Sequence, residues 1–245
     1  MLDIFYLTFR DDFSQENLDR VWDLAEKSDP NANIITVSHV QGIYNAHRQC
    51  AKQSSTENFF VIDADAWLLD DFDLGYDPST AKDIYPNTPA SKCTHVWRAK
   101  NPATGMLYGY GGVKLFHRDA FDGNSDVVDM TTTVASRGFP YYAVQSVSNI
   151  TKFNSTPKKA WRGAFRECAK LAAGEVDWNN DTEKKIAQWT NPLEDCENRE
   201  FVILGAKFGS DYGKMWSSDK SALRRINDWD WLDNVYNETV GEGDV

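Results

Sequence analysis

The hydrophobic and polar positions in the first part of the chain predict apolar strands that alternate with amphipathic helices. Residues 3–9 and 34–40 are apolar and rich in β-branched and aromatic side chains, which is typical of buried strands. A helical spacing of apolar residues begins at Ser14 and recurs over 42–53, and a third strand is predicted at 59–65. This alternation predicts parallel strands joined by right-handed helical crossovers.

The pattern is less regular after Asp73. A Pro- and Ser-containing segment precedes two further predicted strands, which flank a glycine-rich turn, and helices are predicted in the C-terminal part. We therefore predict an α/β fold with a mostly parallel, Rossmann-like central sheet, flanking helices and a helical C-terminal extension. The two predicted strands are 94–102 and 109–121, and the predicted helices are about 161–173, 182–189 and 221–236. We predict that residues 1–160 form the ligand-binding and catalytic part of one domain and that residues 161–245 form the helical part of the same domain.

Composition and charge narrow the classes of function. The 245 residues are 41% hydrophobic, which indicates a folded globule, and the net charge of −11 argues against a protein that coats nucleic acid non-specifically. An enzyme with a local basic groove is compatible with that charge. The N-terminus lacks a signal-peptide pattern and no run approaches 18 apolar residues. We expect no membrane partner, a cytoplasmic location and four reduced, scattered cysteines.

An acidic motif follows the third predicted strand. Asp63 and Asp65 form a D-x-D directly after an apolar run, at the carboxyl end of a strand, where open α/β sheets bind ligands. Two carboxylates one residue apart point to the same side of an extended chain. They are candidates to share Mg²⁺ or Mn²⁺, which would in turn hold a diphosphate leaving group. The alternative is a solvated acidic loop.

Two segments that follow contain candidate pocket residues. In YGYGGVKLF, Tyr110, Gly111 and Gly112 precede an apolar strand, and the glycines permit close approach of backbone to a ligand. An ordinary tight hairpin is the alternative. Arg98, in HVWRAKN, is a candidate for contact with a diphosphate or an acceptor. Asp126 or Asp129 is a candidate general base for an acceptor hydroxyl, with helix or turn capping as the alternative.

Residues 151–166 form a basic segment without acidic residues. Such side chains can track phosphates while aromatic rings stack on bases. The alternative is a solvated loop that leads into an amphipathic helix whose rings face the core. The candidate contacts to DNA are Lys152, Lys158, Lys159 and Arg162.

The ordered series VIDAD, VWRAKNP, YGYGGVKLF, DMTTTV, VSNITKFN and WRGAFREC resembles a glycosyltransferase-like family of T-even-type tailed bacteriophages, over about residues 1–235. That family is similar to GT-A glycosyltransferases, which use nucleotide-diphosphate sugars and usually a divalent metal. Its phage members are associated with glycosylation of 5-hydroxymethylpyrimidines in phage DNA, including arabinosylation of hydroxymethylcytosine.

The resemblance implies roles for individual positions. Asp63 and Asp65 match the metal-binding D-x-D, Gly111 and Gly112 match the glycine pair that lines the donor and acceptor pocket, and Asp129 is the nearest match to the catalytic carboxylate. The chain departs from the family pattern at Asp129, where Asp-Met-Thr replaces the usual Glu-Asp pair, and it has no evident C-terminal histidine to complete a metal site.

The resemblance therefore implies a GT-A-like, metal-dependent enzyme that transfers a sugar, with arabinose and glucose as candidates, from a UDP-sugar. The implied acceptor is a 5-hydroxymethylcytosine-type base in double-stranded phage DNA, and the implied location is the cytoplasm of an infected bacterium. Two alternatives stay open at this point: a GT-A enzyme that acts on a glycan or a small molecule, and a non-catalytic GT-A-like binding protein.

Overall fold

The structure is a computed structural model that describes residues 2–10, 14–108, 111–122, 130–176 and 181–241. The chain divides into two compact units. The sheet unit comprises Met1–Asn101, Leu107–Asp126 and Met130–Thr151, and the helical unit comprises Pro102–Met106, Val127–Asp129 and Lys152–Val245. The chain passes from the first unit into the second after Thr151.

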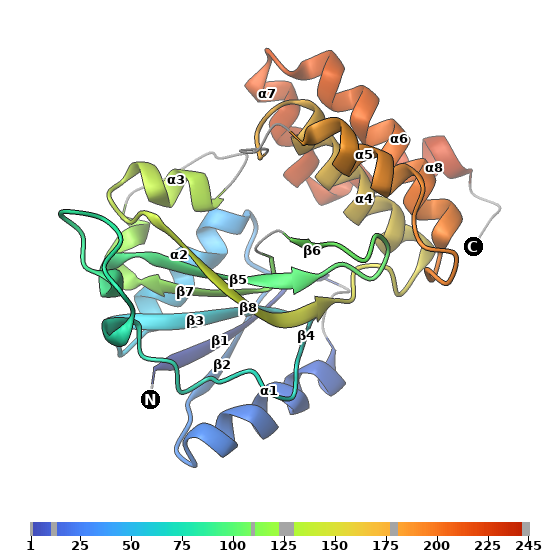
Figure 1. Cartoon of the computed structure of the whole chain (residues 1–245). Coiled ribbons are helices and arrows are strands. Elements are labelled where there is room, and N and C mark those ends of the chain that lie inside the picture. The colour runs from blue at the N-terminus through green and yellow to red at the C-terminus, as the bar shows by residue number, and fades with distance from the viewer. Residues whose placement is uncertain (1, 11–13, 109–110, 123–129, 177–180, 242–245) are drawn as a thin grey trace. The chain divides into compact units, whose positions relative to one another are not determined.

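One mixed β-sheet organises the sheet unit, with the strand order β2-β1-β3-β7-β5-β8-β4 and β6 paired to β5 (Figure 1). Pairs β1–β2, β1–β3 and β5–β8 are parallel, and the other pairs are antiparallel. Strands β1, β2, β3, β5 and β8 consequently all run in one direction. The strands are β1 (Asp3–Thr8), β2 (Ile34–Ser38), β3 (Asn58–Asp63), β4 (Ala66–Leu68), β5 (Thr94–Lys100), β6 (Leu107–Tyr108), β7 (Val113–His117) and β8 (Tyr141–Thr151).

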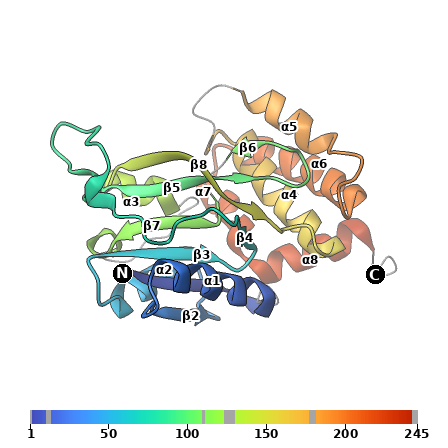
Figure 2. The same cartoon turned by 60° about the horizontal axis from the view of Figure 1, so that its bottom comes forward.

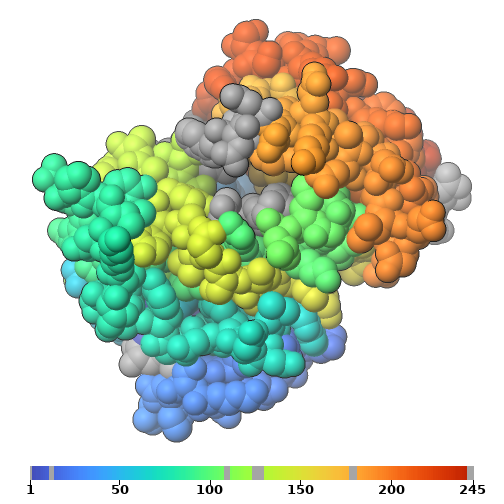
Figure 3. Space-filling model, viewed as in Figure 1, coloured from blue at the N-terminus to red at the C-terminus, as the bar shows by residue number. Residues whose placement is uncertain are grey.

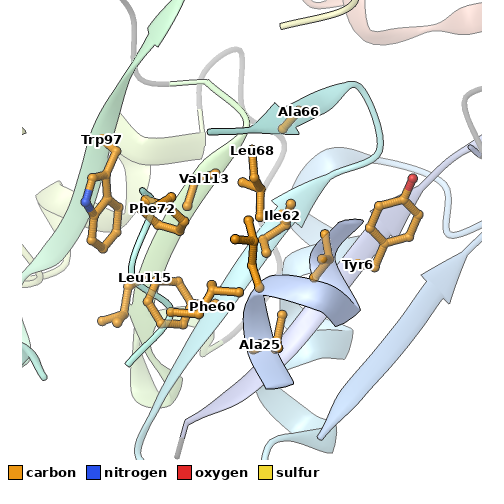
Figure 4. Packing of buried hydrophobic residues seen from close by; sticks show 14 of the residues in the cluster. Tyr6, Ala25, Phe60, Ile62, Ala66, Leu68, Phe72, Trp97, Val113 and Leu115 are labelled. Atoms are coloured by element: carbon orange, nitrogen blue, oxygen red, sulfur yellow. The ribbon is translucent and has the colours of Figure 1, made fainter. Parts of the chain in front are cut away.

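The first face of the sheet packs on helix α1 (Gln15–Ser28). Ser14 caps this helix, since its hydroxyl accepts a hydrogen bond from the backbone N–H of Asn17 at 3.2 Å. The buried cluster on this face combines side chains of α1 with alternate residues of β1, β3 and β7, as Figure 4 shows. Its members include Ile4, Tyr6, Val21, Leu24, Ala25, Phe60, Ile62, Trp97, Val113 and Leu115.

The second face packs on helix α2 (Ile43–Gln53) through aromatic rings. The His47 ring lies edge-on to Phe116 and stacks on Phe121, with centroid distances of 5.4 and 5.9 Å. Phe59 packs against the same two phenylalanines. Because Phe59 and Phe60 are consecutive strand residues, they point to opposite faces, and β3 is therefore buried on both sides.

The long strand β8, which lies between β5 and β4 in the sheet, was not predicted. Figure 2 shows it beside β5, and its final residues pair with β4, with Asn149 opposite Leu68. Short helix α3 (Met130–Ser136) precedes it. The segment 77–92, by contrast, lies on the surface as predicted for an irregular stretch (Figure 3). A pocket lined by residues 83–89 of this segment contains none of the predicted site residues.

Two long helices, α4 and α6, pack against each other and form the centre of the helical unit. Three glycines of α6 face the backbone of α4: a Cβ added to Gly205 or Gly209 would lie 2.2 Å from the Trp161 oxygen or 2.1 Å from the Phe165 oxygen. Glycine at these positions therefore permits the close approach of the two helices. The helices are α4 (Pro157–Ala172), α5 (Thr182–Thr190), α6 (Arg199–Trp216), α7 (Lys220–Leu223) and α8 (Trp229–Val240).

The structure confirms the predicted α/β class, the flanking helices and the helical C-terminal part. The predicted strand 109–121 is too long, because β7 begins at Val113 and ends at His117. The predicted helix 221–236 is wrong as a single element: Asp228 caps a separate helix, α8. Helix α6 was not predicted. No helix in the described ranges is long and apolar enough to cross a membrane.

Candidate functional site

The D-x-D motif lies in the tight turn between β3 and β4. Asp63 is the last residue of β3, and Asp65 is half-buried in the turn. The backbone of Ala64 fixes that turn: its N–H donates to the Leu7 carbonyl at 2.9 Å, and its carbonyl accepts from Asn17 Nδ2 at 2.6 Å. Strand β1 and helix α1 therefore hold the backbone from which both carboxylates project.

The carboxylate of Asp63 is held by Lys114 of β7 and by Gly112, the residue directly before this strand. Its Oδ2 accepts from Lys114 Nζ at 3.1 Å and from the Gly112 backbone N–H at 3.3 Å. The Asp63 backbone N–H donates to the Gly112 carbonyl at 2.8 Å. The sequence analysis did not single out Lys114, although a lysine inside the apolar run VKLF was a usable signal.

Gly112 is a position that requires glycine. Its φ is +87°, and an added Cβ would lie 2.8 Å from Asn149 Nδ2 and 2.9 Å from Ala66 Cβ. An added Cβ at Gly111 would meet nothing within 4 Å. The structure therefore brings Asp63 and Gly112 together and gives the glycine pair unequal constraints.

The remaining predicted pocket residues are distributed differently. Arg98 is half-buried in β5, two residues beyond Val96, which pairs with Lys114, so it lies toward the same edge of the sheet as Asp63. Tyr110, Asp126 and Asp129 lie outside the described residues. Their roles stay predictions.

The two aspartates fit a metal site that is shared with a diphosphate. Within the described ranges, no group of three or more His, Cys, Asp or Glu side chains is placed to hold a metal ion. Mg²⁺ in nucleotide sites is commonly held by one or two carboxylates together with phosphate oxygens. The motif therefore fits a divalent cation that shares its ligands with a diphosphate.

A neutral histidine lies beneath the motif. His47 is fully buried, its Nδ1 lies 2.8 Å from the Ile43 carbonyl, and its Nε2 has no hydrogen-bond partner among the residues that the structure describes. Burial, together with the positive charge of Lys114, lowers the pKa of His47 to about 4. The imidazole is consequently neutral at physiological pH, and Nδ1 carries the proton that it donates to Ile43.

Because the pKa of His47 is lowered in the folded state, we expect the fold to be less stable at acidic pH. The unfolded pKa of about 6.5 exceeds the folded value of about 4, so the unfolded chain binds the extra proton within that window. The free energy of unfolding is therefore highest above pH 6.5, and it decreases by about 3 kcal/mol in total as the pH falls toward 4. We expect urea unfolding of His47→Gln to depend less on pH over this window than unfolding of the wild type. The control is His39→Gln, at an exposed position. Equal pH slopes in wild type and His47→Gln would contradict the assignment.

Two further histidines, His95 and His117, and the four cysteines are buried. His95 bonds to Tyr76 Oη and the Ala90 carbonyl at 2.9 and 2.7 Å, and His117 Nε2 lies 3.0 Å from Glu57 Oε1. All four cysteines are buried and free, as expected for reduced thiols, and burial raises the pKa of the Cys50 thiol to about 12.

The basic segment forms the start of α4 in the helical unit and is used there for internal contacts. Lys158 Nζ lies 2.8 Å from Asp233 Oδ2 on α8. Arg162 is buried, with its guanidinium carbon 3.4 Å from the centre of the Trp229 ring. That position gives Arg162 a packing role on the indole face.

The aromatic residues of this segment face the interior. Trp161 and Phe165 are buried and stack at a centroid distance of 4.8 Å, which agrees with the alternative of an amphipathic helix whose rings face the core. Lys152 is exposed before the helix, and the backbone N–H of Lys159 donates to the capping Thr156 hydroxyl at 3.2 Å. The rings of Trp161 and Phe165 are therefore not available for stacking on bases.

No protein-family model matches the chain, and no curated protein matches it. Among solved structures, the chain is similar to a glycosyltransferase involved in the glycosylation of the major capsid of PBCV-1, with 16% identity, 58% of this chain and 81% of that chain covered, and a TM-score of 0.33. It is also similar to the mannosyltransferase PcManGT from Pyrobaculum calidifontis in complex with GDP-Man and Mn²⁺, with 13% identity, 100% of this chain and 76% of that chain covered, and a TM-score of 0.42.

Proposed function

We propose that this chain is a metal-dependent glycosyltransferase of the GT-A type. It transfers a sugar from a UDP-sugar donor to a hydroxyl group. The observation that carries the proposal is the anchored turn with Asp63 and Asp65 at the carboxyl end of β3. Ligands of open α/β sheets bind at that edge. The intact D-x-D motif disfavours a non-catalytic GT-A-like binding protein that lacks a working metal site.

Each proposed role follows from a position in the motif. Asp65 and the free oxygen of Asp63 would contact Mn²⁺ or Mg²⁺, which, when bound, stabilises the charge of the departing diphosphate. Gly111 and Gly112 are the proposed lining of the donor and acceptor pocket, with open space beside Gly111, and Arg98 is the proposed side-chain contact to the diphosphate. The bond from the sugar anomeric carbon to the diphosphate breaks, and a bond to the acceptor oxygen forms. The acceptor proton passes to a general base, for which Asp129 is proposed.

The proposed acceptor is a 5-hydroxymethylcytosine-type base in double-stranded DNA, with arabinose or glucose as the transferred sugar. Support comes from the resemblance and from the basic side chains that keep some exposure: Lys152 is exposed, and the Lys158 side chain is 38% exposed despite its ion pair. The burial of Arg162 removes it from the proposed DNA contacts. The proposed contacts to DNA are then Lys152, Lys158 and Lys159. The proposed location of the enzyme is the cytoplasm of an infected bacterium.

A glycan or a small molecule is the second candidate acceptor. The ion pair of Lys158 with Asp233 and the burial of Arg162 favour it, because these basic groups serve the helical unit itself. Such an enzyme would keep the same donor site and the same requirement for a divalent cation.

Donor hydrolysis and transfer should separate these possibilities. We expect release of nucleoside diphosphate from one or a few members of a nucleotide-sugar panel with Mn²⁺, and loss of that release in EDTA. Hydroxymethylated DNA should accelerate release and become labelled by the sugar, whereas unmodified DNA of the same sequence should not. Acceleration by a glycan mixture alone would favour the second acceptor class. Absence of binding to every nucleotide-sugar would overturn the enzymatic proposal.

A further inference from the structure

Lys114 is a buried cation within the apolar run Val113–Phe116 of strand β7. It lies in β7 opposite Val61, between Val113 and Leu115, and its side chain is only 10% exposed. A lysine ammonium is costly to remove from water unless an opposite charge compensates it. Among the described residues, its ion-pair partner is Asp63.

The partner carboxylate is held in an asymmetric way. Lys114 and the Gly112 N–H both donate to Oδ2 of Asp63, whereas Oδ1 has no hydrogen-bond partner within the described part of the chain. The Asp63 side chain is 28% exposed, so the carboxylate is accessible from solvent. The two donors thus engage one oxygen and leave the other for a ligand.

Aromatic rings lie on the same face of the sheet as the Lys114–Asp63 pair. Phe116 and His47 pack on the same face of the sheet, and His47 is neutral. Burial of the pair strengthens its interaction relative to an exposed ion pair. Lys114 therefore places one positive charge directly beside the D-x-D motif.

We propose that Lys114 is a positioning residue of the donor site: it orients Asp63 and reduces the charge of the D-x-D motif, so that the site takes a divalent cation together with a diphosphate and not the free ion. This inference rests on the proposed function. The positive charge of Lys114 weakens the attraction of the carboxylates for free Mn²⁺, and the diphosphate of the donor supplies additional negative charge.

Direct binding of Mn²⁺ to the full chain, followed by electron paramagnetic resonance without donor, tests the charge effect. Lys114→Met keeps the length of the side chain and removes its charge, so it should tighten binding of free Mn²⁺ about tenfold. Lys52→Met is the matched control, because Lys52 is an exposed lysine at the end of α2. Unchanged Mn²⁺ affinity in Lys114→Met would overturn the charge effect.

A double-mutant cycle with Asp63→Asn tests the positioning. Lys114→Met should lower kcat about 30-fold in the wild-type background and change it less than threefold in the Asp63→Asn background, since the oriented carboxylate is already absent. The double variant removes both charges of the pair and should unfold at a higher urea concentration than Lys114→Met alone. Equal losses of kcat in both backgrounds would overturn the positioning role.

The two proposals fail in different ways. A wild type that binds neither Mn²⁺ nor any Mn²⁺–nucleotide-sugar pair overturns the proposed function and the role of Lys114 with it. A wild type that binds and turns over the donor, while Lys114→Met matches it in Mn²⁺ affinity and kcat, overturns only the role of Lys114.

Discussion

Asp65→Ala is expected to lower the rate of sugar transfer by at least about 10³-fold, which corresponds to about 4 kcal/mol of transition-state stabilisation. The loss follows from the proposed contact of this carboxylate with the cation that neutralises the departing diphosphate. Folding should be retained, because Asp65 lies half-buried in a turn whose backbone is fixed through Ala64. Initial rates of donor cleavage at saturating Mn²⁺, combined with urea unfolding, measure the two effects separately.

Asp71→Ala is the matched control, since this exposed carboxylate belongs to the same acidic stretch. It should change neither the rate nor the Mn²⁺ requirement. Asp65→Asn should behave like Asp65→Ala if negative charge is what matters, and only partly so if the side chain acts through a hydrogen bond. Rates that are unaffected both by EDTA and by Asp65→Ala would refute the metal-dependent donor site.

Gly209→Ala is expected to destabilise the helical unit by about 3 kcal/mol. The added Cβ would lie 2.1 Å from the Phe165 carbonyl oxygen on α4, and the contact is with backbone, which cannot rotate away. Helix propensity alone predicts the opposite sign, because alanine is favoured over glycine by about 1 kcal/mol inside a helix. Urea unfolding followed by tryptophan fluorescence distinguishes the two.

The control for Gly209→Ala is Lys207→Ala, at an exposed position of the same helix. It tests alanine on α6 away from α4 and should change stability by less than about 0.5 kcal/mol. Gly205→Ala should resemble Gly209→Ala, since its Cβ would lie 2.2 Å from the Trp161 carbonyl oxygen. A Gly209→Ala protein as stable as the wild type would show that α4 and α6 do not approach as closely as described.

Elements with strong local periodicity were predictable from the sequence. The apolar runs and the period-3.6 patterns of the N-terminal part predicted β1, α1, β2, α2 and β3 nearly at their observed bounds. Because β3 is a central strand, its apolar run had to be buried on both faces, and Asp63 had to follow at its carboxyl end. The position of the D-x-D motif was therefore predictable, whereas its chemical role stays a prediction.

Elements that depend on distant partners were not predictable in this way. Strand β8 mixes polar and apolar residues, and its pairing with β5 and β4 connects segments far apart in the chain. Helix α6 has glycines that lower local helix propensity, and their reason becomes visible only against the backbone of α4. The basic segment was ambiguous for the same reason, because the sequence does not show that Trp229 and Asp233 lie against it.

The sequence by itself determined the class of the fold and the edge of the sheet at which its acidic motif lies, since both follow from the periodicity of neighbouring residues. The tertiary structure alone decided which groups meet there. Lys114 reaches Asp63 because the antiparallel register places it opposite Val61, two residues before that aspartate on the same face of β3. Gly112 is required because Asn149 and Ala66, from two other strands, occupy the space of a side chain. Such contacts depend on register and close packing between segments distant in sequence, which no local pattern encodes.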